Sequence, residues 1–214
     1  MPGCLAIFVV LLLLASLLFG LVYFQAITLS FHRLGLSPTG AMLLFAASLI
    51  GSLVNIPVSR RPVLIEPANH HLFRFFFYFP PRVEQQVIAV NVGGAVVPVL
   101  FSLYLLPGAP VLPTLVATAV VTAVAKMLAR PVPAVGITLP GFIPPLVAVG
   151  MALLLAHDEA PRVAYISGTL GVLIGADLLN LPALRTMPAL MLSIGGAGVF
   201  DGIFLVGILA VLLT

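Results

Sequence analysis

The sequence predicts an all-α membrane protein: a bundle of about seven transmembrane helices, at least one of them discontinuous. Three observations support this fold class. Hydrophobic residues make up 62% of the 214 residues and charged residues only 7%, whereas soluble domains average about 25% charged residues. The mean hydropathy is +1.27. Apolar stretches of about 20 residues, enough to span a bilayer, recur along the chain. We therefore exclude a soluble or disordered protein and expect one transmembrane domain, 1–214.

The first span is expected at 4–31. No charged residue lies between Leu5 and Phe24, and the stretch is too long, and lacks the basic start, for a cleaved signal peptide. The other expected spans are 39–58, 87–106, 110–128, 134–157, 162–181 and 188–214.

The basic residues of the connecting segments predict the orientation, since Lys and Arg accumulate on the cytoplasmic side of membrane proteins. With seven spans, one side receives Arg60, Arg61, Arg74, Arg82, Lys126, Arg130 and Arg185. The other side receives only Arg33 and Arg162. This asymmetry predicts a multi-pass protein of the cell (inner or plasma) membrane with a cytoplasmic N-terminus. The basic residues form no run typical of a nucleic-acid-binding patch, so the expected partner is the lipid bilayer.

The segment 59–86 is predicted to be an interfacial cytoplasmic loop. It is rich in phenylalanine and arginine and contains Pro80-Pro81, a composition that suits the lipid headgroups. His70 and His71 would point about 100° apart on a helix and so bind one metal ion poorly. The sequence also lacks nucleotide-binding, dinucleotide-binding, zinc-protease and serine-hydrolase motifs. We therefore expect no metal and no cofactor.

Two carboxylates within the predicted spans, Asp177 and Asp201, indicate a functional site. A carboxylate in the middle of a bilayer costs about 2.5–3.5 kcal/mol on insertion scales, so such residues usually face a polar interior. Asn180 shares a helical face with Asp177, while Asn55 and Asn91 belong to polar stripes in the second and third spans. These five residues predict an intramembrane site that binds or transports a cation, a proton or a small polar solute.

The fifth predicted span contains a break in its helix. Pro140, Pro144 and Pro145 each lack the N–H that a helix needs. We expect the interruption between Thr138 and Pro145, and expect it to face protein or water, because freed carbonyls need partners. Discontinuous helices of this kind form midplane sites in many transporters.

An intramembrane aspartyl protease is the alternative function. Gly175-Ala176-Asp177 resembles the glycine–aspartate motif of prepilin-peptidase and presenilin-type proteases, and Pro144-Pro145-Leu146 loosely resembles their proline–alanine–leucine motif. The resemblance implies that Asp177 and Asp201 are catalytic. The order of the motifs along the chain departs from those families. A hairpin centred near 184 or 185 would also leave the two aspartates offset by roughly 12 Å, which favours the cation or proton site.

The stretches 168–177 and 193–204 resemble a family of bacterial and archaeal membrane proteins known only as a domain of unknown function. The resemblance includes Asn55-Ile56-Pro57 and the proline-rich fifth span. It supports a polytopic membrane protein and implies no activity.

Overall fold

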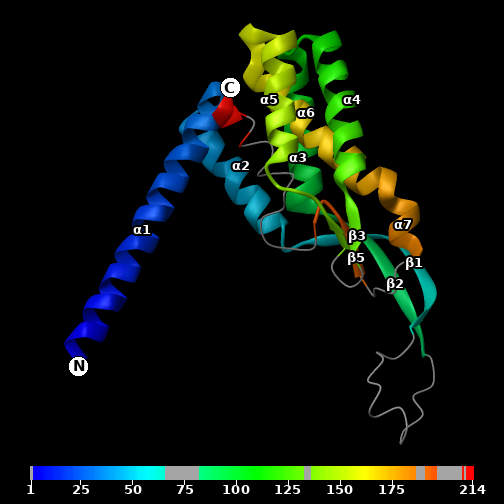
Figure 1. Ribbon diagram of the computed structural model, residues 1–214, viewed down its shortest axis with the longest axis horizontal. Helices are drawn as coiled ribbons and strands as arrows, with labels where there is room; N and C mark the ends of the chain where they lie inside the picture. Colours follow the sequence, from blue (N-terminus) through cyan, green and yellow to red (C-terminus); the bar gives the residue numbers. More distant parts are fainter. Residues whose placement is uncertain (1, 66–81, 133–135, 187–190, 197–208, 210) are drawn as a thin grey trace, which may run out of the picture.

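The computed structural model describes residues 2–65, 82–132, 136–186, 191–196, 209 and 211–214. In this part of the chain the fold is mostly helical, with a three-stranded and a two-stranded sheet at one end (Figure 1). The helices are α1 (Pro2–Arg33), α2 (Pro38–Gly51), α3 (Val97–Leu105), α4 (Val111–Leu128), α5 (Ile143–Leu155), α6 (Ala160–Val172) and α7 (Leu181–Thr186). The strands are β1 (Asn55–Ile65), β2 (Arg82–Asn91), β3 (Arg130–Val132), β4 (Gly136–Thr138) and β5 (Met191–Ile194).

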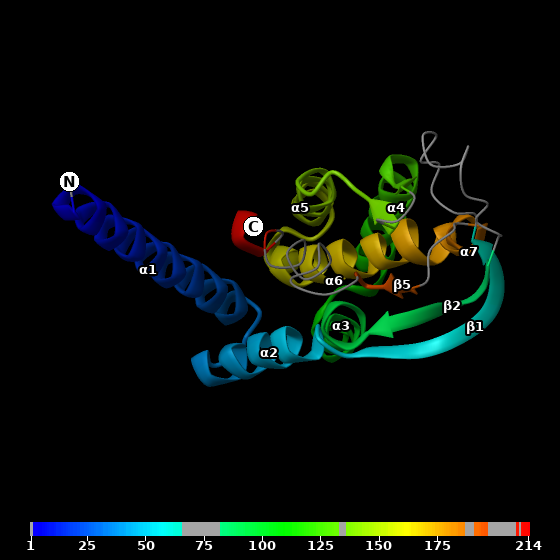
Figure 2. The ribbon, with the colours of Figure 1, turned by 90° about the horizontal axis from the view of Figure 1, so that it is seen from below.

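The larger sheet has the order β1-β2-β5. Strands β1 and β2 are antiparallel, with Asn55 opposite Asn91 and an irregularity between Pro57 and Ser59. Strand β5 is parallel to β2, with Ser193 opposite Ala89. Figure 2 shows the sheet beside the helices, with β5 lying between β2 and α6. A late segment of the chain is therefore brought against an early hairpin.

Helix α6 is the centre of the helical part and packs against α3, α4 and α5. Glycine and other small residues let it approach its neighbours closely, as is common where helices associate in membranes. A Cβ added at Gly175 would lie 2.3 Å from the carbonyl oxygen of Thr122, and one at Gly171 would lie 2.6 Å from Cγ1 of Val121. The contact between α4 and α6 therefore depends on the absence of side chains at these two positions.

Two helical segments contain π turns. One, Val92–Val96, follows β2 directly and leads into α3, and the other, Leu173–Asp177, follows α6. A short 3-10 turn, Leu178–Asn180, then leads into α7. Turns of the π type occur frequently at functional sites. Both lie at the end of the molecule that contains the larger sheet (Figure 1).

The helices expose much apolar surface. Within the described residues, two helical segments are long and apolar enough to cross a membrane, Val111–Leu128 and His157–Ala183. Three shorter apolar helices are Pro38–Gly51, Val92–Gly108 and Ile143–Leu155. Helix α1 is 32 residues long, projects from the rest of the fold (Figure 1), and exposes leucines such as Leu17 and Leu18.

The mostly helical prediction is confirmed, but the all-α class is wrong because the sheet was not expected. Within the predicted spans 39–58 and 87–106, α2 ends at Gly51 and β1 begins at Asn55, while β2 continues to Asn91 before the helix starts. The described residues of the predicted loop 59–86 belong to strands β1 and β2, and 66–81 lie outside the described residues. The error has a physical cause: a short apolar run adjoining a helix has the same composition whether it is strand or helix.

The remaining predicted spans differ in outcome. Helices occupy most of 4–31, 110–128 and 162–181, as expected. The described part of 188–214 includes strand β5 instead of one continuous helix. The described residues therefore include two candidate membrane-spanning helices and do not show the predicted bundle of about seven.

In the fifth predicted span, 134–157, the described residues form a strand and then a helix, so no helix precedes the predicted break. Strand β4 ends at Thr138 and α5 begins at Ile143. Pro140 lies in the irregular connection, while Pro144 and Pro145 are buried in the first turn of α5, where the missing N–H has no helical partner to lose.

Candidate functional site

Polar groups from distant parts of the chain meet around β5. The hydroxyl of Ser193 donates to Oδ1 of Asn55 at 2.7 Å. Two residues later, the backbone N–H of Gly195 donates to Oδ2 of Asp177, also at 2.7 Å. Strand β5 and the turn after it therefore connect the β1–β2 hairpin to the carboxylate at the end of the π turn of α6.

Asp177 is half-buried and is the last residue of its π turn. Its hydrogen-bond donor, Gly195, has a φ of +82°, a conformation that side chains other than glycine rarely adopt. A Cβ at Gly195 would also lie 2.6 Å from the Cβ of Ala95. The backbone N–H can therefore reach the carboxylate only because this residue is glycine.

Asn91 forms hydrogen bonds with three other residues. It is only 1% exposed, and its Nδ2 donates to the carbonyl of Ser52 at 2.8 Å and to Oδ1 of Asn55 at 3.2 Å. Its Oδ1 accepts from the N–H of Gly94 at 2.7 Å, which caps the first π turn. Oδ1 of Asn55 thus accepts from both Asn91 and Ser193, which uses its two lone pairs. Asn55 and Asn91 therefore stabilise the junction where β1, β2 and β5 meet. Their amide oxygens are already bonded within the fold.

Asn180 likewise forms hydrogen bonds with the backbone of the second π turn. It is buried, and its Nδ2 donates to the carbonyls of Ala176 at 2.8 Å and Gly175 at 3.2 Å. Its Oδ1 accepts from Nζ of Lys126 at 2.6 Å, and the same ammonium donates to the carbonyl of Leu179 at 2.9 Å. Asn180 and Lys126 therefore hold the turn that ends at Asp177.

The structure brings four of the predicted site residues into one region: Asn55, Asn91, Asp177 and Asn180. Asp201 lies outside the described residues, so its distance from Asp177 stays a prediction. Ser193, Gly195 and Lys126 were not among the predicted site residues. Lys126 could have been found, because it lies four residues after Thr122 and continues the row of Thr114 and Thr118 along one face of α4.

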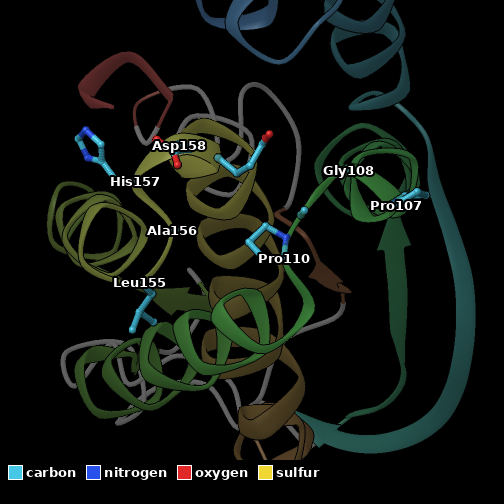
Figure 3. Close-up of a pocket in the computed structure, with 9 residues that line it drawn as sticks. Pro107, Gly108, Pro110, Leu155, Ala156, His157 and Asp158 are labelled. Carbon is cyan, nitrogen blue, oxygen red and sulfur yellow. The ribbon is translucent and has the colours of Figure 1, made fainter.

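The described residues include no group of three or more His, Cys, Asp or Glu side chains that could hold a metal ion. A cavity of about 580 Å³ lies between the α3–α4 and α5–α6 connections (Figure 3). It is lined by Pro107, Gly108, Ala109, Pro110, Leu155, Ala156, His157, Asp158 and Glu159. His157 and Asp158 are exposed, and Glu159 is bound to Arg162. This open hollow is at the opposite end of the fold from the sheet and β5 (Figure 1).

A family model described as protein of unknown function DUF1614 matches residues 49–213. The chain belongs to this family. The matched residues begin in α2 and include the β1–β2 hairpin, both π turns and β5, so the whole site described above falls within the family's region. No curated protein and no solved structure matches the chain.

Proposed function

We propose that this DUF1614 protein is embedded in a membrane and binds a proton or a small cation at Asp177, as part of moving it across the bilayer. The observation that supports this function most directly is the half-buried Asp177 carboxylate at the end of a π turn, held by the N–H of Gly195. Asn55, Asn91 and Asn180 stabilise the backbone around it.

The surface supports membrane insertion. Only 22% of the span Val111–Leu128 is buried inside the fold, and its Leu112 and Leu115 are 72% and 62% exposed. Water would not favour apolar side chains exposed on this scale, whereas lipid chains would. The predicted orientation places the N-terminus and the end of the fold that contains the sheets in the cytoplasm. It follows from the excess of arginine and lysine on that side of the predicted spans.

The chemistry of Asp177 favours a proton or a cation over a larger solute. A carboxylate that is partly removed from water gains from protonation or from a cation. The amides around it are occupied by internal hydrogen bonds, and the carboxylate differs from them in carrying a negative charge, which a proton or a cation neutralises. Helices broken beside a polar site also occur in transporters, and here the break is the π turn followed by the 3-10 turn.

The test is flux into proteoliposomes, measured with a pH-sensitive dye for protons and with sodium and potassium indicators for cations. Asp177→Asn keeps the size of the side chain and an oxygen to accept from Gly195, but removes the charge and the proton site. We expect it to lower flux at least tenfold with the fold intact. The matched control is Asp158→Asn, an exposed acid at the other end, which should leave flux unchanged. Unchanged flux in a folded Asp177→Asn protein would overturn the proposal.

The alternative, an intramembrane aspartyl protease, is favoured by one observation: Asp177 contacts Gly195, in the segment that leads to Asp201. A dyad that shares a proton requires the two carboxyls within about 3–5 Å. It predicts that Asp177→Asn and Asp201→Asn each abolish cleavage of a membrane-spanning peptide, while neither changes ion flux. If flux and cleavage are both unchanged, Asp177 is structural.

A further inference from the structure

Basic side chains gather at the end of the fold that contains the sheets. Nη2 of Arg61 on β1 donates to the carbonyl of Arg185 on α7, so these two segments are adjacent. Lys126 near the end of α4 contacts Leu179 and Asn180, directly before α7. Arg130 begins β3 two residues after α4 ends. Hydrogen bonds thus bring segments that are far apart in sequence to one end of the molecule (Figure 1).

The opposite end has a different balance of charge. There, Arg162 forms an ion pair with Glu159 and also donates to the carbonyl of Gly108. Asp158 is a further exposed acid, and Arg33 lies within 3.5 Å of the carbonyl of Val211. Two arginines and two acids therefore compensate one another at this end.

At the sheet end, positive charge is in excess. Arg60, Arg130 and Arg185 are exposed, and none of the salt bridges within the described residues involves them. Among the acidic side chains that the structure describes, the one in this region is the half-buried Asp177, which accepts from the N–H of Gly195. Charges that are exposed and uncompensated produce a positive surface potential, which attracts anions.

Exposed apolar side chains accompany these arginines. Met127, three residues before Arg130, is 83% exposed, and Phe142, just after the β3–β4 hairpin, is 74% exposed. Val58 on β1 is also exposed, two residues before Arg60. Basic and bulky apolar residues side by side are typical of surfaces at the level of lipid headgroups, where the apolar groups reach the acyl chains and the basic groups meet phosphates.

We propose that this basic surface, defined by Arg60, Arg130 and Arg185, binds the headgroups of anionic phospholipids. A membrane leaflet that contains anionic lipid supplies a dense layer of phosphate charge, which matches exposed arginines beside apolar side chains. The proposal rests on the membrane insertion proposed above and is independent of Asp177. The bound lipids fix the depth of the sheet end at the membrane surface.

The experiment measures lipid selectivity in proteoliposomes by electron paramagnetic resonance of spin-labelled lipids. Labelled phosphatidylglycerol and labelled phosphatidylcholine are compared, and their relative association constant is the readout. We expect a several-fold preference for phosphatidylglycerol that decreases at high salt. Exposed arginines near a leaflet attract its anionic lipids, so the triple variant Arg60→Gln, Arg130→Gln, Arg185→Gln should remove most of this preference.

Two further variants make the result specific. The triple arginine-to-lysine variant keeps the charges and should keep the preference. The double variant Arg33→Gln, Arg162→Gln removes basic residues from the opposite end and should also keep it. Equal association of both lipids with the unaltered protein, or a preference that survives the triple glutamine variant, overturns the proposal. So does loss of the preference on adding inorganic phosphate at unchanged ionic strength, which would indicate an ion site.

Failure of membrane insertion would be seen separately. If alkaline carbonate releases the protein from membranes, insertion itself is wrong, and both this proposal and the proposed transport fail. If the protein stays in the membrane and moves ions but shows no lipid preference, only the lipid-binding proposal fails.

Discussion

The backbone N–H and C=O groups find their hydrogen-bond partners differently in the helical core and at the sheet junction. In the core formed by α4, α5 and α6, the helices make their own hydrogen bonds and meet through small apolar residues such as Ala117, Ala125 and Ala164, all buried. At the junction of β1, β2 and β5, the chain changes from strand to π turn, and side-chain amides complete the bonding. Asn91 bonds to two backbone groups at the first π turn, and Asn180 bonds to two at the second, beside β5.

The difference shows where sequence specificity is needed. A regular helix leaves few backbone groups unpaired, so many apolar residues of suitable size serve in its interior. Irregular backbone in an apolar environment needs a polar partner for each freed group, because an unpaired one costs several kcal/mol in lipid. We therefore expect substitutions in the core to act through volume, and those at the junction through lost hydrogen bonds.

The largest effect is expected from volume in the core. Gly171→Val places a branched side chain on α6 where a single Cβ already lies 2.6 Å from Cγ1 of Val121 and 2.7 Å from its Cβ. Helices α4 and α6 would have to separate. Overpacking typically costs about 1–3 kcal/mol and sometimes more, and we expect the upper part of that range. Unfolding in a mixed-micelle titration measures it.

A second glycine supplies the control. Gly150 lies in α5, and a Cβ added there meets nothing within 4 Å. Gly150→Ala should therefore be neutral or raise stability by up to about 1 kcal/mol, as expected when alanine replaces glycine in a helix. If Gly171→Val unfolded no more easily than Gly150→Ala, the close contact between α4 and α6 would be wrong.

An intermediate effect is expected at the junction. Asn91→Ala removes two hydrogen bonds donated by its amide and the cap on the N–H of Gly94, and it leaves buried partners unpaired. Loss of buried hydrogen bonds of this kind costs about 1–3 kcal/mol; we expect about 2 kcal/mol in the same titration. Asn91→Asp retains the cap but not the donors and should recover only part of the loss.

Asn55→Ala provides the comparison within the junction. Asn55 is half-buried and accepts two hydrogen bonds, from Asn91 and Ser193, whereas the buried Asn91 forms three, so removal of Asn55 should cost less. An Asn91→Ala protein as stable as the unaltered one would show that the junction does not depend on its amides.

The helices could be predicted from the sequence because their signals are local. Apolar runs of span length identify α1 and α4, and the prolines of 138–145 place the start of α5. The sheet could not be predicted in the same way. Strand β5 is four residues long and pairs with a strand about 100 residues earlier in the chain, and no local pattern specifies such a partner. Strands β1 and β2 adjoin apolar helices and are themselves partly apolar, so their ends were included in the predicted spans 39–58 and 87–106.

The sequence identified several residues of the candidate site, but not which groups these residues contact. Asn55, Asn91, Asp177 and Asn180 stood out because polar groups are rare in apolar segments. The roles of the asparagines as supports for π turns depend on where the backbone departs from the α-helix, which composition does not reveal. The contact between Asp177 and Gly195 depends on the positive φ of a glycine, and the sequence contains 19 glycines.

The smallest effect is expected from Lys126, which joins the two regions. Lys126→Met keeps the apolar stem but loses the ammonium that holds Oδ1 of Asn180 and the carbonyl of Leu179. Because the residue is largely exposed, we expect a loss of only about 0.5–1 kcal/mol in global stability. The local effect should be clearer: a looser π turn weakens the bond from Gly195 to Asp177, so that N–H should exchange with deuterium about fivefold faster.

Hydrogen exchange of the Gly195 amide, followed by NMR or mass spectrometry, distinguishes this positioning role from a general loss of stability. Lys126→Arg keeps a cationic donor and should restore slow exchange, since a charged donor to an amide oxygen is what the turn requires. Arg130→Gln removes a positive charge nearby without touching Asn180 and should leave exchange unchanged. Equal exchange at Gly195 in the methionine and arginine variants would mean that Lys126 does not act on Asp177 through Asn180. The junction would then be held by its asparagines alone, with no contribution from the helical core.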